Sequence, residues 1–91
     1  MSEFIAIGLK RAAIILADEL DYARAAEHLS IPHTELRKQI SALEAQLYFH
    51  IFKPRQRKVE LTEEGQFLIK AFREAVALHD RSAGKASGDT Q

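Results

Sequence analysis

The chain holds 91 residues, enough for one small domain with one modest hydrophobic core, because domains typically span about 50 to 200 residues. It has 13 Lys and Arg, 13 Asp and Glu and no Cys, which excludes a disulfide scaffold, a thiol nucleophile and a zinc site built on thiolates. The charge is uneven: residues 1–30 have three basic and five acidic side chains, residues 31–61 have six and three, and residues 62–91 have four and five. An anionic partner is therefore expected to bind the middle third.

The start of the chain lacks the pattern of a secretory signal, because Glu3 precedes any basic residue and Lys10 and Arg11 interrupt the apolar stretch. The longest run without a polar residue, 12–17, is far shorter than the roughly 20 residues needed to span a bilayer. These features favour a soluble, cytoplasmic protein with no membrane partner.

Two helices are predicted in the first third. Between Glu3 and Leu20 there is no Pro, and apolar residues recur around nearly the whole helical wheel, which predicts a mostly buried first helix. Asp21 is a good N-cap for a short, Ala-rich second helix from Tyr22 to about Leu29.

A third helix is expected to begin near residue 32 or 33, because Pro32 is tolerated in a first helical turn and disfavours helix at the preceding residue. It should end near Tyr48. Apolar residues at steps of four, three and four form one core stripe, Leu36, Ile40, Leu43 and Leu47. Polar residues share the opposite, solvent-facing side, namely Thr34, Arg37, Lys38 and Ser41.

Residues 50–61 predict a small hairpin, since Lys58–Leu61 alternates polar and apolar side chains. Its tip is basic, with four cations within six positions, namely Lys53, Arg55, Arg57 and Lys58. Thr62 is expected to cap a fourth helix that runs to about Asp80. The small and polar residues 82–91 predict a disordered tail.

The fourth helix has apolar residues over about 200° of its wheel, more than one small core would cover. This excess predicts a homodimer through the fourth helix, bordered by two residues of the first. The expected interface residues are Ile7, Ile14, Phe67, Ala71, Ala75 and Leu78.

The order of these elements is typical of a mainly α winged helix-turn-helix with a two-stranded wing and a long C-terminal linker helix. We expect a DNA-binding domain over 3–61, a linker and dimerisation helix over 62–81 and the tail over 82–91. The third helix would lie in the major groove of duplex DNA and the wing on the backbone or minor groove. The candidate DNA contacts are Arg24, His33, Thr34, Arg37, Lys38, Ser41, Lys53, Arg55, Arg57 and Lys58.

Several motifs resemble the amino-terminal DNA-binding domain of LysR-type transcriptional regulators. They are Tyr22–Leu29, Gln39-Ile40-x-x-Leu43-Glu44, Ile51-Phe52 and Val59-x-Leu61-Thr62-Glu63-Glu64-Gly65. They occur in the family's order and spacing, and the resemblance covers about residues 8–80. Molybdate-responsive regulators have a similar amino-terminal domain.

The chain departs from the family pattern where DNA is read. The family's Ser-Gln-Pro/Ser-Ala run at the start of the recognition helix is replaced by Pro32–Arg37, so base preference does not transfer. Tyr48 stands where the family has a helix-closing Gly, and Pro54 where it has an Arg. The family's effector-binding domain is absent, so the chain is either a fragment or a stand-alone domain, and no small-molecule effector site is expected within it.

Catalysis and metal binding have no support in the sequence. The four histidines, His28, His33, His50 and His79, lack the spacing of metal ligands on one helix, and no nucleophile has a matching base. We therefore expect no enzyme, cofactor or metal. An alternative is an interaction module that pairs through the fourth helix with a larger regulator and binds DNA weakly.

Overall fold

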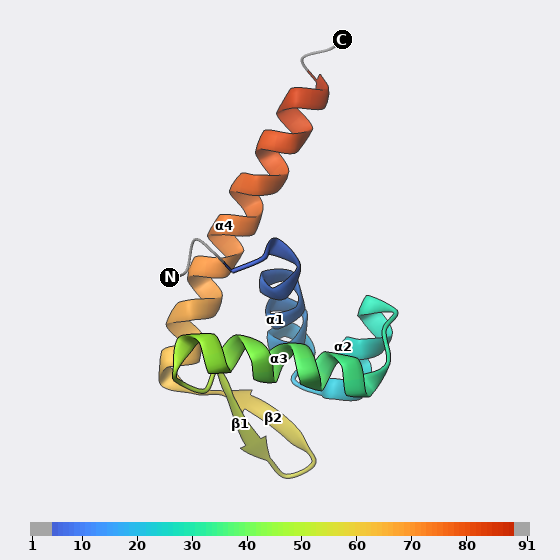
Figure 1. Cartoon of the computed structure of the whole chain (residues 1–91), viewed down its shortest axis with the longest axis vertical. Helices are drawn as coiled ribbons and strands as arrows, with labels where there is room; N and C mark the ends of the chain where they lie inside the picture. The colour runs from blue at the N-terminus through green and yellow to red at the C-terminus, as the bar shows by residue number, and fades with distance from the viewer. Residues whose placement is uncertain (1–4, 89–91) are drawn as a thin grey trace.

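The structure, a computed structural model, describes residues 5–88 and has the predicted winged helix-turn-helix architecture (Figure 1). Four helices and one hairpin follow in the order α1 (Ile7–Glu19), α2 (Tyr22–Leu29), α3 (His33–Leu47), β1 (Phe52–Arg55), β2 (Lys58–Leu61) and α4 (Glu63–Gly88). The first part of α4 packs beside α1, and its later turns extend away from the body, while the hairpin projects from the opposite end (Figure 1).

The first helix starts later than predicted, at Ile7 and not at Glu3. Residue Ala6 precedes it, and its side chain offers no cap for the first N–H groups. Ile5 lies outside the helix and is buried in the core. Residues 5 and 6 thus lie outside the helix, while residue 3 lies outside the described residues.

The second and third helices begin where predicted. The Asp21 carboxylate accepts the backbone N–H of Ala23 at 2.9 Å and of Arg24 at 3.3 Å, which caps α2. Pro32 precedes α3 in an extended conformation. Tyr48 closes α3 in the left-handed region with φ 63°, so the helix keeps the left-handed end although Gly is missing.

A single core joins the helices to the base of the wing. The predicted stripe of α3 lies in it, with Leu36, Ile40 and Leu43 buried and Leu47 partly buried. The other fully buried large side chains are Leu16 of α1 and Ile51, directly before β1. The core thus fixes the wing relative to α3.

The predicted end of the fourth helix near Asp80 is wrong, because α4 continues to Gly88. The expected disordered tail over 82–91 therefore does not match residues 82–88, and residues 89–91 lie outside the described part. The segment after Ser82 contains no Pro, the residue that disfavours a helix interior most. Within residues 5–88, no helix combines the length and apolar composition that a membrane crossing requires.

Candidate nucleic-acid interface

The predicted reading face of α3 is exposed. Leu36, Ile40 and Leu43 point into the core, so the side of the helix opposite to them faces solvent. The exposed candidates on this helix are His33, Thr34, Arg37, Lys38 and Ser41. The helical wheel therefore predicted correctly which side of α3 faces solvent. Contact of these residues with DNA stays a prediction.

Tyr22 is a neighbour of this face that sequence reasoning did not select. It is the first residue of α2, and its ring centroid lies 4.3 Å from Cζ of Arg37 and 6.0 Å from the ring centroid of His33. Burial raises the pKa of the Tyr22 phenol, and the charge of Glu44 raises it further, while Arg37 opposes both. Residues 22 and 37 are too far apart in sequence for any local pattern to pair them.

The wing carries its charges on one face. Antiparallel pairing sets Lys53 opposite Glu60 and Arg55 opposite Lys58, so these four side chains share a face. Nζ of Lys53 lies 3.5 Å and a guanidinium nitrogen of Arg55 lies 3.6 Å from Glu60 carboxylate oxygens. One acidic residue therefore partly neutralises two of the four wing cations.

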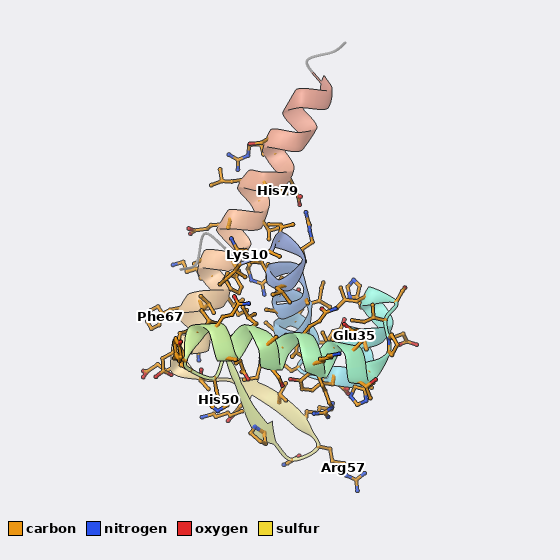
Figure 2. All side chains as sticks on the ribbon, viewed as in Figure 1. Lys10, Glu35, His50, Arg57, Phe67 and His79 are labelled. Atoms are coloured by element: carbon orange, nitrogen blue, oxygen red, sulfur yellow. The ribbon has the colours of Figure 1, made fainter. Side chains whose placement is uncertain are left out.

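The turn of the wing holds the remaining tip cation. Gln56 and Arg57 form a two-residue turn, and Gln56 adopts a positive φ of 56°. Arg57 extends from the tip away from the helices (Figure 2). Among the described residues, neither Arg57 nor Lys58 takes part in a salt bridge. These two side chains are free to meet an anionic backbone.

The wing is attached to the helices by hydrogen bonds at both strands. The mostly buried carboxylate of Glu44 accepts the backbone N–H of Ile51 at 2.7 Å and of Phe52 at 3.1 Å. On the other strand, the Val59 N–H donates to the carbonyl of Leu20 at 3.2 Å. The sequence contained Glu44 only as part of a motif, and its partners explain why a carboxylate stands there.

The start of α4 is hydrogen-bonded to the segment that precedes β1. The Thr62 hydroxyl donates to the His50 carbonyl at 2.7 Å and accepts the N–H of Gly65 at 2.9 Å, which confirms Thr62 as the cap of α4. A Cβ on Gly65 would lie 2.2 Å from the carbonyl oxygen of Ile51. Gly65 is therefore required by close backbone approach, with no positive φ.

A groove of about 290 Å³ separates the reading face from the wing. Its walls combine cations with apolar surface, and the lining includes Tyr22, Arg37, Phe52, Lys53, Pro54, Gln56, Arg57, Lys58 and Val59. Arg24 lies in the first turn of α2 and pairs with Glu19 at 3.4 Å. Four of the ten predicted contacts, Arg37, Lys53, Arg57 and Lys58, thus line a common groove.

The predicted dimer surface is partly covered within the monomer. On α4, Ile69 and Phe72 are buried in the core. The remaining candidates divide into exposed Phe67, Ala71 and Leu78 and partly buried Ile7, Ile14 and Ala75. Phe67 points outward from α4 (Figure 2) and is 74% exposed, and Leu78 is 58% exposed. An apolar surface thus remains on α4.

Two salt bridges join α4 to α1. A guanidinium nitrogen of Arg73 lies 2.6 Å from a carboxylate oxygen of Asp18, and Arg11 pairs with Asp80 through two hydrogen bonds. The Arg11 guanidinium holds the pKa of the Asp80 carboxyl below its usual value. These exposed ion pairs accompany the packing of Ile69 and Phe72 of α4 in the core.

Known structures share this fold. The chain superposes on the crystal structure of a CbnR DNA-binding domain–DNA complex with a TM-score of 0.88 at 24% identity, covering 96% of this chain and 100% of that one. A complex of the BenM DNA-binding domain with catB site 1 DNA gives 0.91 at 22% identity, covering 96% and 98%.

Sequence comparison identifies relatives. The HTH-type transcriptional regulator YnfL of Escherichia coli is 33% identical over 76 residues, 84% of this chain and 26% of that protein. BudR of Klebsiella aerogenes is 35% identical over 78 residues, 86% and 54% respectively. The chain therefore spans about a quarter to a half of the length of these relatives. The model for bacterial regulatory helix-turn-helix proteins of the lysR family matches residues 9–66, which is more than half of the chain, and the chain belongs to this family.

Proposed function

We propose that the chain binds duplex DNA sequence-specifically, as part of transcription control, and that it does so in the cytoplasm. The observation that carries this proposal is the groove between α3 and the wing, which four cations line. Phosphate contacts by such cations supply much of the affinity of DNA-binding proteins, and base contacts supply the specificity. The charge of the middle third of the chain thus lies where an anionic strand could enter.

We assign each candidate contact residue a role in DNA binding from the chemistry of its side chain. Arg37 and Lys38 can donate to guanine O6 and N7, and Thr34 can contact a thymine methyl group in the major groove. His33 and Ser41 extend the same exposed face. The remaining cations are assigned to phosphates, namely Arg24, Lys53, Arg55, Arg57 and Lys58.

We also propose that the chain acts as a homodimer through α4. Phe67 and Leu78 expose large apolar surface, and a two-fold axis would present two α3 helices to half-sites about 34 Å apart or a multiple of it. No catalytic step, cofactor or small-molecule effector is assigned to this chain.

The test is selection of bound sequences from random duplex DNA with the purified chain, followed by affinity measurement over a range of salt concentrations. We expect an enriched sequence of two related half-sites and a log-log salt slope of about −0.9 per phosphate contact. A chain that forms dimers but enriches no sequence would contradict sequence-specific binding and favour the interaction module.

A further inference from the structure

The contact between Tyr22 and Arg37 joins two elements of the candidate interface. Tyr22 opens α2, and Arg37 lies in the second turn of α3. The centroid-to-Cζ distance of 4.3 Å places the guanidinium over the phenol ring within cation–π range. Fourteen residues separate Tyr22 from Arg37 along the chain, so the contact is tertiary.

A stacked guanidinium keeps its hydrogen-bonding capacity. The ring covers one face of the Arg37 group, while the N–H donors lie along the edge of the guanidinium plane. Among the described residues, Arg37 forms no salt bridge, whereas Arg24 pairs with Glu19 and Arg55 with Glu60. Arg37 is thus oriented by an aromatic surface and not by a carboxylate, so its donors remain available for a base edge.

The ring is itself held in place. Its residue follows the Asp21 cap, whose carboxylate binds the N–H groups of Ala23 and Arg24. Tyr22 is partly buried, packs against the core and lines the groove between α3 and the wing. The His33 ring lies on the same part of the surface, 6.0 Å away. A fixed ring can reduce the number of rotamers that a long Arg side chain samples before binding.

We propose that Tyr22 is a positioning residue for DNA specificity, which holds Arg37 in the orientation that reads a base. This inference rests on the proposed DNA-binding function. It assigns base discrimination at one position to a pair of residues on two helices, of which only Arg37 touches the base.

The test is a double-mutant cycle on the whole chain, with wild type, Tyr22→Leu, Arg37→Ala and the double variant. The probes are the duplex selected by the wild type and a random duplex of the same length, at one salt concentration. Tyr22→Leu should lower the ratio of the two affinities about three- to tenfold, as expected for a partly desolvated cation–π contact. The same change in the Arg37→Ala background should leave the ratio unaltered, because the residue being positioned is gone.

Tyr22→Phe is the conservative control, since it keeps the ring and removes the hydroxyl. It should retain discrimination within about twofold. Losses that add in the double variant, or Tyr22→Phe behaving like Tyr22→Leu, would overturn the positioning role and leave the proposed function standing. A wild type that enriches no sequence would instead overturn the proposed function, and this inference with it.

A measurement without DNA keeps the inference testable if Tyr22→Leu fails to fold. In NMR spectra, the side-chain Nε–H proton of Arg37 should be shifted upfield by the ring current in the wild type and in Tyr22→Phe. An Arg37 resonance at the position of an unstacked arginine in the folded wild type would overturn the contact directly.

Discussion

Glu60 is the acidic side chain within the basic face of the wing. Its carboxylate contacts both Lys53 and Arg55, so part of their charge is already compensated within the chain. Exposed pairs of this kind contribute about 0.2–1 kcal/mol each, and DNA phosphates compete for the same cations. We expect Glu60→Gln to raise affinity for any duplex about two- to fivefold, with discrimination unchanged.

The control for Glu60→Gln is Glu74→Gln, the same charge change at an exposed position of α4 remote from the wing. Binding isotherms of both variants at one salt concentration check the prediction. An equal gain from both variants would attribute the effect to net charge alone.

Gly65 supports the joint between the wing and α4. Because a Cβ there would lie 2.2 Å from the Ile51 carbonyl oxygen, Gly65→Ala must displace backbone. We expect a loss of about 1–3 kcal/mol in the free energy of unfolding. Gly8→Ala is a matched control, since a Cβ at residue 8 would meet nothing within 4 Å, and it should stabilise α1 by up to about 1 kcal/mol. Urea denaturation measures both, and an unchanged midpoint for Gly65→Ala would contradict the close approach.

At the scale of the elements, the wing is expected to hold DNA without reading it. Replacing Arg55 and Arg57 together by Ala should flatten the log-log salt slope by about one to two units and weaken all sequences alike. The control is Lys70→Ala with Arg81→Ala, which removes two exposed charges from α4. A salt slope that stays unchanged in the wing variant would contradict a wing contact with DNA. Equal flattening of the slope in the wing variant and in the control would contradict it as well.

Sequence reasoning located most helix boundaries and missed two, the start of α1 and the end of α4. Asp21, Pro32 and Thr62 act through groups within a few residues, so their signals are local. Ile5 is buried outside α1, and α4 continues past Asp80 to Gly88. Local sequence patterns therefore predicted neither of these two helix boundaries.

The candidate site shows the same division between local and tertiary information. The helical and hairpin periodicity of the sequence predicts which cationic side chains are exposed. It correctly assigned Arg37 and Lys58 to solvent-facing surfaces. The partners that orient or neutralise such cations come from other segments, as Tyr22 and Glu60 do. Only the folded chain brings these groups together.

For the whole molecule, the decisive question is whether α4 pairs with a second copy. Leu78→Glu would place a charge on the exposed apolar side of α4 and should shift a micromolar dimer toward monomer. Ala77→Glu, at an exposed position on the polar side of the same helix, should leave the dimer intact. Sedimentation velocity distinguishes the species, and a wild type that stays monomeric throughout would refute the dimer.

The backbone of Ile51 connects α3, the wing and the start of α4. The N–H of this residue is bound by Glu44 of α3, and its carbonyl accepts the N–H of Thr62 at the start of α4. The proposed reading helix α3, the wing and α4 therefore meet at one hydrogen-bonded corner, which sets the angle between α4 and α3. In a dimer built through α4, this angle would fix the rotational phase between the half-sites. One added base pair between the half-sites would turn the second half-site by about 35° around the DNA axis. The angle between α3 and α4 could change to match that rotation only by straining the hydrogen bonds at Ile51.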